Sequence, residues 1–272
     1  MAKKEFNPAE QVDVIVKFIQ EYFVNNGTPN TKAVIGISGG KDSTIAAALL
    51  VRALGKDRVV CVMMPQGEQT DITDSYKVCD FLHIPDENCF EINIGKTVQT
   101  LYDEVVYLGK NEGSWTSPAI LTNTPARIRM TTLYMVASAV GGRVCNTGNA
   151  SEKFIGYTTK YGDLAGDFAL FTELTVREIY AIGDYLGLPT HLVHKAPSDG
   201  MSGKTDEDNT GIPYDAIDDF LLENKHPNME IYEKMIAANK RNQHKDCIHL
   251  PHPYRICSHL YNASGICDAW CF

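Results

Sequence analysis

The stretch Ala33-Val34-Ile35-Gly36-Ile37-Ser38-Gly39-Gly40-Lys41-Asp42-Ser43-Thr44 decides the fold, because it reads as a strand, a turn and a helix in succession. The apolar run from Ala33 to Ile37 is typical of a strand in a parallel sheet that is covered on both faces. Gly39 and Gly40 allow a sharp turn and a close approach of the backbone to a ligand. The apolar residues from Thr44 to Leu54 predict a buried helix, and the start of that helix offers unpaired N–H groups to an anion.

The turn itself carries a recognisable motif. Ser38 to Ser43 lacks the Lys-Ser/Thr pair that closes a Walker A loop. It resembles the pyrophosphate-binding loop of the ATP pyrophosphatase family, whose members cleave ATP between its α and β phosphates and adenylate a carbonyl oxygen of the substrate. The alternative is an ordinary strand–turn–helix corner, since Ser, Gly and Asp are common in turns and at helix N-caps.

Composition and charge limit the classes of function. Of the 272 residues 44% are hydrophobic and 22% are charged, as in a typical globular protein. The formal net charge of −9 argues against nonspecific nucleic-acid binding, which depends on Lys and Arg neutralising phosphates. No apolar run approaches the roughly 18 residues of a membrane span, and no secretory signal follows Met1. We expect one cytoplasmic domain over residues 1–272, with an N-terminal helix and an irregular tail.

The tail gathers cysteine and histidine residues. The chain has eight cysteines without a framework spacing, so reduced thiols are expected. The tail lacks a Cys-x-x-Cys pair and zinc-finger spacing, which favours buried thiols and surface histidines; a structural metal stays the alternative. The residues concerned are Cys247, His249, His252, Cys257, His259, Cys267 and Cys271.

Strands alternate with helices through the first half of the chain. The helical stripe of Pro8–Asn26 predicts a helix that covers the core or forms a subunit contact. Further strands are predicted at Arg58–Met64, Cys89–Ile94 and Arg143–Asn146, and further helices at Asp71–Leu82, Lys96–Leu108 and Thr124–Ala139. This alternation predicts an α/β fold with a doubly wound, mostly parallel sheet and helices on both faces. Ligands of such sheets bind at the carboxyl ends of the strands.

Polar side chains follow the strand Arg143–Asn146. Thr147, Glu152, Lys160 and Asp163 lie in a glycine-punctuated segment that should face the loop around Gly39. ATP chemistry needs a hard cation that carboxylates hold on the phosphates, and Asp42 and Glu152 suit that role. The lysine supplies a point charge for phosphate oxygens.

The same segment carries a closer resemblance. Gly-Asn-Ala-Ser-Glu at 148–152, followed by Thr-Lys-Tyr-Gly-Asp at 159–163, is similar to the signature of the ammonia-dependent NAD synthetases. The similarity covers nearly the whole chain. It includes Gln69–Asp71, Asn123–Met130, Gly203–Asp208 with Gly211 and Tyr214, and the late His244-Lys245.

The resemblance implies a role for each matching residue. ATP phosphates would lie on Gly36, Ser38, Gly39, Gly40, Lys41, Asp42 and Ser43, with further ATP contacts from Thr147 and Ser198. Asp42 and Glu152 would hold Mg²⁺. Deamido-NAD would contact Arg127, Lys160, Asp167, His244 and Lys245. The resemblance also implies a tight homodimer with the dinucleotide near the subunit interface.

The sequence departs from the family pattern at one important position. Val176 stands where the family has a Lys that approaches ATP, and Arg177 lies about 100° further round a helix. Lys195 or Lys204 are candidates to supply the missing charge. Ser198 for Thr, and Asp246 for Arg, are lesser departures.

The two arginines of Thr124–Ala139 point to different faces of the predicted helix. Arg127 and Arg129 are two positions apart, so at most one of them should reach a given ligand.

The implied reaction is the ATP-dependent amidation of deamido-NAD to NAD by ammonia, through an adenylated carboxylate, with release of AMP and pyrophosphate. Such chemistry needs positioning and charge neutralisation but no covalent nucleophile. Asp163 is the candidate to take the proton from ammonia. The chain is too short to add a glutamine-hydrolysing domain, so ammonia is expected as the direct donor. Two alternatives remain: another adenylating enzyme of the ATP pyrophosphatase family that acts on tRNA or a nucleobase, and a nucleotide-binding sensor without turnover.

Overall fold

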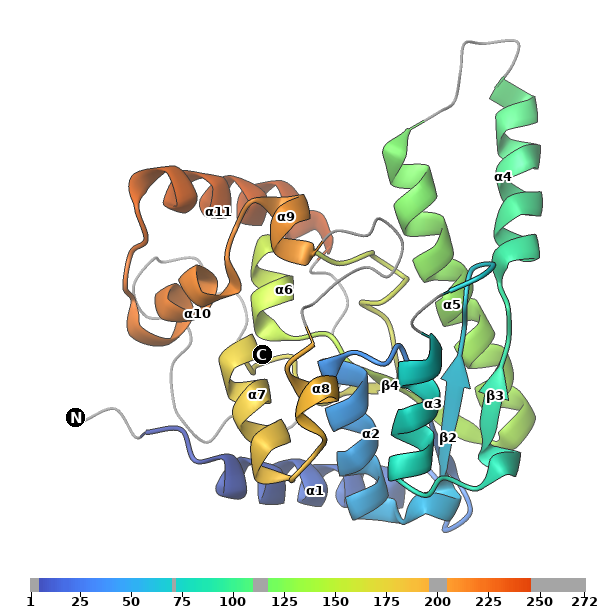
Figure 1. Ribbon diagram of the computed structural model, residues 1–272. Helices are drawn as coiled ribbons and strands as arrows, with labels where there is room; N and C mark the ends of the chain where they lie inside the picture. The colour runs from blue at the N-terminus through green and yellow to red at the C-terminus, as the bar shows by residue number, and fades with distance from the viewer. Residues whose placement is uncertain (1–4, 70–71, 110–116, 196–204, 246–272) are drawn as a thin grey trace.

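The computed structural model describes residues 5–69, 72–109, 117–195 and 205–245 (Figure 1). Its centre is a five-stranded sheet in the order β3-β2-β1-β4-β5, in which every described pair of neighbours is parallel. The strands are β1 (Lys32–Gly36), β2 (Val59–Met63), β3 (Cys89–Glu91), β4 (Gly142–Asn146) and β5 (Phe168–Ala169). The predicted doubly wound parallel sheet is confirmed.

Helices connect and cover these strands. The α-helices are α1 (Pro8–Asn25), α2 (Lys41–Leu54), α3 (Ile72–Phe81), α4 (Gly95–Gly109), α5 (Pro118–Val140), α6 (Ala150–Ile155), α7 (Val176–Tyr185), α8 (Thr190–Val193), α9 (Asp206–Thr210), α10 (Tyr214–Glu223) and α11 (Met229–Asn242). Short 3-10 turns are η1 (Lys56–Arg58), η2 (Asp86–Asn88) and η3 (Gln243–Lys245).

Three element boundaries differ from the prediction by more than one residue. Helix α2 begins at Lys41, three residues early, because the N–H of Thr44 already donates to the carbonyl of Gly40 at 3.1 Å. Helix α5 begins at Pro118, since Ser117 caps it and proline is tolerated in a first turn. Strand β3 ends at Glu91 instead of Ile94, although the chain still runs beside β2: the N–H of Ile94 donates to the carbonyl of Pro65 at 2.9 Å.

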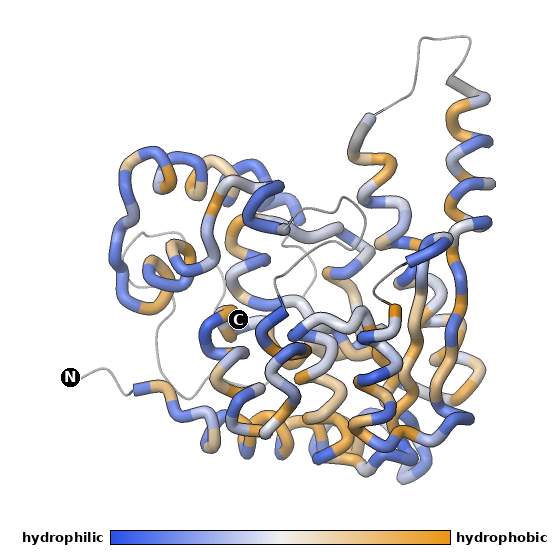
Figure 2. The backbone as a smooth tube through the Cα atoms, in the orientation of Figure 1, coloured by the Kyte–Doolittle hydropathy of each residue, from blue (hydrophilic) through white to orange (hydrophobic). Residues whose placement is uncertain are grey.

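The two faces of the sheet are covered by different helices. Alternate residues of a strand point to opposite faces. Ile35 of β1 packs in an apolar cluster with residues of α1, α2 and α7, whereas Val34 packs with Leu133 of α5. Figure 2 shows hydrophobic residues along β2 and β3, while the turns of α4 alternate between hydrophobic and hydrophilic residues.

Helix α1 covers the core, one of the two roles predicted for it. Val12, Ile15, Ile19 and Phe23 form its buried stripe, and the helix contacts α2 and α7 (Figure 1). No helix among the described residues is long and apolar enough to cross a membrane.

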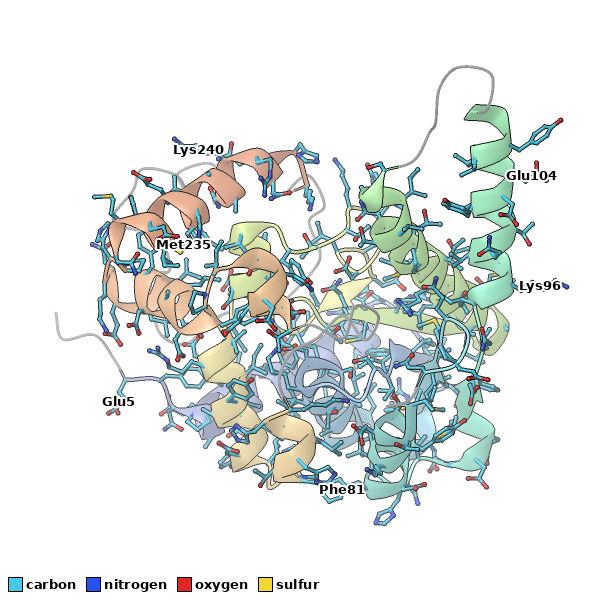
Figure 3. All side chains as sticks on the ribbon, turned by 45° about the horizontal axis from the view of Figure 1, so that its top comes forward. Glu5, Phe81, Lys96, Glu104, Met235 and Lys240 are labelled. Atoms are coloured by element: carbon cyan, nitrogen blue, oxygen red, sulfur yellow. The ribbon has the colours of Figure 1, made fainter. Side chains whose placement is uncertain are left out.

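A second apolar cluster supports α6, which carries Glu152. It joins residues of α6, α7, α10 and α11, and its most enclosed side chains include Ile217 and Met235. Figure 3 shows Met235 pointing inward from α11, while Lys240 of the same helix points to solvent. The position of α6 therefore depends on packing against the last two helices of the described chain.

Asp218 of α10 joins three helices. Its Oδ1 accepts a hydrogen bond from Ser151 Oγ of α6 at 2.6 Å, and its Oδ2 accepts from the N–H of Arg177 at the start of α7 at 2.8 Å. The Ser151 hydroxyl in turn accepts from the N–H of Val176 at 3.1 Å. Asp218 is 1% exposed, and burial raises the pKa of its carboxyl to about 6.

This raised pKa predicts a pH-dependent stability. Between about pH 4 and pH 6 the folded chain holds more protons on Asp218 than the unfolded chain, so the free energy of unfolding falls as the pH rises. We expect wild type to lose stability relative to Asp218→Asn by up to about 3 kcal/mol across this window. Urea unfolding of both proteins from pH 4 to pH 7 measures the difference.

Asp219→Asn is the matched control. Hydrogen bonds from Lys225 and Arg177 lower the pKa of Asp219 below its ordinary value, so its contribution changes only below about pH 4. The difference between wild type and this variant should be flat from pH 4 to pH 7. The assignment for Asp218 is wrong if both variants give the same profile.

Candidate active site

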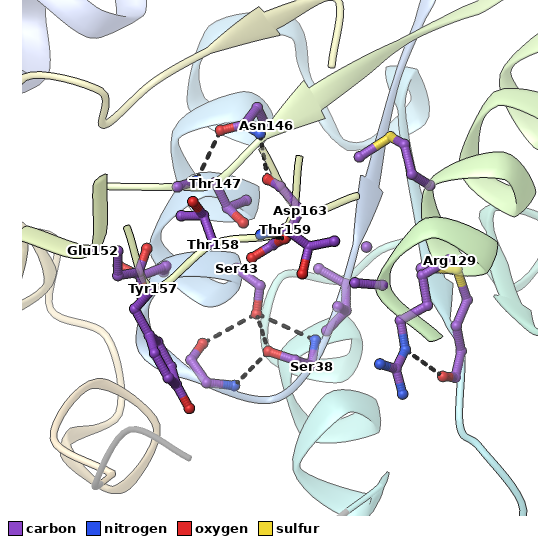
Figure 4. A pocket seen from close by; sticks show the side chains of 18 of the residues that line it. Ser38, Ser43, Arg129, Asn146, Thr147, Glu152, Tyr157, Thr158, Thr159 and Asp163 are labelled. Carbon is purple, nitrogen blue, oxygen red and sulfur yellow. Dashed lines mark hydrogen bonds between the residues drawn. The ribbon is translucent and has the colours of Figure 1, made fainter. Parts of the chain in front are cut away.

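The loop between β1 and α2 is held open by hydrogen bonds among its own residues (Figure 4). Ser38 Oγ and Ser43 Oγ are 3.1 Å apart, and the N–H of Gly40 donates to Ser38 Oγ at 3.3 Å. Gly39 has a φ of +74°, which favours glycine. Within the described chain no side chain caps α2 at Gly40, so its first N–H groups stay available to an anion.

A cavity of about 580 Å³ lies at the carboxyl ends of the strands, which is the size of a small-molecule site. The β1–α2 loop lines it together with residues that follow β2 and β4. Asn146, at the end of β4, organises the far wall: its Nδ2 donates to the carbonyl of Asp163 at 2.6 Å, and its Oδ1 accepts from the N–H of Gly148 at 2.9 Å (Figure 4).

Three carboxylates face this cavity. Asn149 joins two of them, since its Nδ2 lies 3.5 Å from Asp42 Oδ1 and its N–H donates to Glu152 Oε2 at 3.1 Å. Burial and the neighbouring Asp42 raise the pKa of Glu152 to about 8. Burial also raises the pKa of Asp163, whose Oδ1 accepts a hydrogen bond from the N–H of Thr159 at 2.6 Å.

The first two carboxylates have the chemistry of a magnesium site. Asp42 and Glu152 offer hard oxygen ligands beside a loop whose N–H groups are available to an anion, and Mg²⁺ commonly uses one or two carboxylates, substrate phosphates and waters. The described residues contain no group of three or more His, Cys, Asp and Glu side chains that could hold a metal by themselves. The donor set therefore fits a cation that a nucleotide shares.

Comparison with known proteins identifies the family. A family model described as NAD synthase matches residues 11–250. The chain belongs to the NAD synthase family. It is 35% identical over 243 residues to the NH(3)-dependent NAD(+) synthetase of Alkaliphilus metalliredigens, covering 86% of this chain and 96% of that protein. The corresponding protein of Archaeoglobus fulgidus is 33% identical and the match covers 86% and 92%.

Solved structures agree with this assignment. An NMN synthetase from Francisella tularensis superposes with a TM-score of 0.80 at 31% identity, covering 90% of this chain and 98% of that chain. An NAD+ synthetase from Burkholderia pseudomallei gives a TM-score of 0.72 at 26% identity, covering 90% and 92%. The resemblance drawn from the motifs is thus confirmed, as is the fold.

The cavity of this NAD synthase family member brings most predicted site residues together. Its lining includes Gly36, Ser38, Gly40, Lys41, Asp42, Ser43, Thr147, Glu152, Asp163 and Lys245. Gly39 lies between two of them in the loop. Ser198 lies outside the described residues, as do Thr70, Asp71, Lys204, Asp246 and the cysteines and histidines of the tail.

Four residues predicted to contact the acceptor do not line the cavity. Arg127 Nε donates to the carbonyl of Lys160 at 3.2 Å, and Lys160 Nζ donates to the carbonyl of His244 at 2.8 Å, so these three form an exposed cluster. Asp167 directly precedes β5 and lies beside β4, where its Oδ2 accepts from the N–H of Val144 at 2.7 Å.

Arg129, not Arg127, is the arginine that lines the cavity. Its Nε donates to the carbonyl of Met64 at 3.1 Å (Figure 4), and burial lowers its pKa. As expected from their spacing, the two arginines point in different directions. Sequence reasoning omitted Arg129 from the site, although its spacing from Arg127 was the available signal. It also omitted Asn146, whose place at the end of a strand could have indicated a role.

Val176, where the resemblance leads us to expect a Lys, lies buried in the apolar cluster of α6, α7, α10 and α11. Three other lysines are candidates to supply that positive charge. Lys195 lines the cavity and pairs with Asp74 at 2.9 Å. Lys204 is not described. Lys41, which sequence reasoning considered only as part of the loop, is 4% exposed and pairs with Asp42 at 2.8 Å. Burial lowers the pKa of Lys41, but Asp42 and Glu152 outweigh this, so it stands above the ordinary value.

The conformation of Gly39 predicts a selective effect of adding one methyl group. A Cβ at Gly39 would lie 2.8 Å from Asp74 Cβ and would sit on a backbone with positive φ. We expect Gly39→Ala to lower the free energy of unfolding by about 2 kcal/mol and to weaken ATP binding. Urea unfolding and calorimetric titration with ATP measure the two effects.

Gly40→Ala is the control for this test. A Cβ at Gly40 would meet only Ser38 Oγ at 3.3 Å, and the φ of −90° suits any residue. Its unfolding free energy should change by less than about 0.5 kcal/mol. Equal destabilisation by the two substitutions would contradict the role given to Gly39.

Proposed function

We propose that this chain amidates the nicotinate carboxylate of deamido-NAD with ammonia, and that it consumes ATP and releases AMP and pyrophosphate. One observation carries the proposal: a single cavity joins the phosphate loop to Asp42, Glu152 and Asp163. The relatives named NH(3)-dependent NAD(+) synthetase support both the reaction and the nitrogen donor. ATP is the co-substrate of this family.

The reaction has two balanced steps. A carboxylate oxygen of the acceptor attacks the α-phosphorus of ATP, and the bond to pyrophosphate breaks to leave an acyl adenylate. Ammonia then attacks the acyl carbon, loses a proton, and AMP departs with the electrons of the carbon–oxygen bond. The N–H groups at the start of α2 stabilise the phosphate charge, and the cavity holds the two substrates in line.

Asp42 and Glu152 would hold Mg²⁺ in this proposal. The ion would neutralise phosphate oxygens when it is bound there. Glu152 also accepts a hydrogen bond from the N–H of Asn149, and the side chain of Asn149 contacts Asp42. Asn149 therefore fixes the Glu152 carboxylate relative to the loop. The two side chains therefore reach the phosphates in one orientation.

Asp163 is the proposed acceptor of the proton from ammonia. Its raised pKa makes it a stronger base than an ordinary carboxylate, and the bond from Thr159 holds it against the cavity wall. Arg129 and Lys245 line the same cavity and carry the positive charge that an anionic acceptor needs. Arg127, Lys160, Asp167 and His244 lie further out; in this proposal they contact the remainder of the dinucleotide.

The direct test is a stoichiometry. Purified protein with ATP, Mg²⁺, ammonium and deamido-NAD should form NAD, AMP and pyrophosphate in equal amounts, and Glu152→Gln should lower the rate by about 100-fold or more. Pyrophosphate release at the same rate with and without deamido-NAD would overturn the proposed acceptor. Binding of ATP without turnover on any acceptor would favour the nucleotide sensor.

A second acceptor is favoured by one comparison. The solved chain with a TM-score of 0.80 is an NMN synthetase, whereas the NAD+ synthetase from Burkholderia pseudomallei gives 0.72. An NMN synthetase that worked by the same amidation would take the corresponding mononucleotide with a carboxylate as its acceptor. Measuring kcat/KM for the mononucleotide and the dinucleotide in the same assay decides between them.

We also propose a homodimer and a cytoplasmic location. Large apolar side chains are exposed on two neighbouring helices: Leu101 and Tyr107 of α4, and Leu121 and Met135 of α5. A shallow groove includes Met135 together with Tyr134 and Tyr161. Exposed apolar surface of this kind marks protein contacts. The free thiols of Cys61, Cys79, Cys89 and Cys145 suit a reducing compartment.

A charge on this surface should separate the subunits. Met135 is 69% exposed, and we expect Met135→Asp to raise the dimer dissociation constant about tenfold or more. Sedimentation velocity over a concentration series gives that constant. Met229→Asp is the control, because Met229 is 70% exposed on α11, away from the α4–α5 surface. Equal effects of the two substitutions, or a monomeric wild type, would contradict the proposed interface.

A further inference from the structure

A buried ammonium group belongs to Lys41, the first residue of α2, directly after the turn of the phosphate loop. The side chain of Lys41 is 3% exposed, and its Nζ lies 2.8 Å from Asp42 Oδ2. Two aromatic rings enclose it: the centroid of Tyr180 is 5.9 Å from Nζ and that of Tyr214 is 5.7 Å away. A buried charge is costly unless it is paired, so this arrangement is a specific feature of the site.

The ammonium belongs to the same charge group as the two proposed metal ligands. Lys41, Asp42 and Glu152 all line the cavity. Asn149 contacts both carboxylates, so the three charged side chains form one cluster. With both carboxylates ionised, as metal ligands are, the cluster would carry two negative charges without Lys41 and a formal charge of minus one with it.

The niche around Lys41 is built by distant helices. Tyr180 of α7 stands one helical turn after Val176 and on the same face, and Val176 is itself 3% exposed. Tyr214 begins α10. These contacts hold the lysine away from bulk solvent and leave Asp42 as its hydrogen-bonding partner in the loop.

We propose that Lys41 is a positioning residue that makes Mg²⁺ entry depend on the nucleotide. Its ammonium offsets one carboxylate charge, so the Asp42–Glu152 pair attracts a divalent cation weakly until nucleotide phosphates add their own negative charge. The same ammonium attracts those phosphates. The inference rests on the proposed function, since it assumes that these carboxylates hold the metal.

Opposite changes in two binding constants test this role. Lys41→Met removes the charge and keeps a side chain of similar length. Mn²⁺, followed by electron paramagnetic resonance, should bind the nucleotide-free variant about tenfold or more tightly than wild type. In EDTA, α,β-methylene-ATP should bind the variant about tenfold or more weakly. A purely structural role predicts that both ligands bind more weakly, and that result would overturn the proposal.

Two further variants test whether the effect is specific to the charge of Lys41. Lys195→Met removes another cavity lysine, one that pairs with Asp74; it should weaken nucleotide binding and change Mn²⁺ affinity less than twofold. An equal rise in Mn²⁺ affinity there would overturn the specific role of Lys41. Lys41→Gln is neutral but polar, and it replaces Lys41→Met if thermal unfolding shows that the first variant does not fold.

Glu152→Gln separates this inference from the proposed function. It should strongly weaken Mn²⁺ binding to the complex of the protein with α,β-methylene-ATP, because only Asp42 and the phosphates remain as ligands. Unchanged Mn²⁺ binding in Glu152→Gln would overturn the proposed metal site, and the role of Lys41 with it. Loss of binding there, together with the wrong sign in Lys41→Met, would overturn only the role of Lys41.

Discussion

The pairing of β1 with β2 on one side and β4 on the other is the constraint on which the site depends. The chain leaves β1 through α2 to reach β2, and it returns through α5 to β4, so the loops after β1 and β4 diverge and open a crevice between them. Ala33 and Ile35 face one side of the sheet while Val34 faces the other. A slip of one residue would exchange those faces, so the apolar core fixes the register and thereby the position of the loop.

The polar residues of the site could be predicted where the pattern that places them is local in sequence. The strand, turn and helix around Gly39 follow from an apolar run, two glycines and a helix start, all within a dozen residues. Glu152 and Asp163 were predicted to face that loop because they follow a parallel strand, and the cavity contains both. These inferences needed only the rule that carboxyl ends of parallel strands meet at one edge.

Other features depend on contacts that no local pattern specifies. Strand β5 has only two residues, Phe168 and Ala169, which is too short for a periodicity. The burial of Lys41 depends on Tyr180 and Tyr214, which lie far along the chain. Asp218 joins helices that the sequence does not place side by side. The spacing of Arg127 and Arg129 predicts that they point to different faces of a helix, but only the packing of α5 on the sheet decides which of them reaches the cavity.

Charge is divided within the cavity in a way that can orient two anionic substrates. Figure 4 shows Glu152 and Arg129 on opposite sides of Ser38 and Ser43. On the Glu152 side, Lys41 pairs with Asp42, and ionised Glu152 adds a negative charge that suits a cation carried by phosphates. Elsewhere in the cavity Asp163 interacts with two cations, Arg129 and Lys245. The two cations exceed the charge of this carboxylate, which suits an anionic acceptor.

This division follows from where the cations are anchored. Arg129 donates to the carbonyl of Met64, and Lys245 donates to the carbonyls of Gly156 and Thr158 at 2.7 and 2.6 Å. Carbonyl partners orient a cation without cancelling its charge, whereas the carboxylate of Asp42 cancels that of Lys41. The strands therefore determine where the cavity lies, and the carbonyl partners leave positive charge on Arg129 and Lys245, where the proposed acceptor would bind.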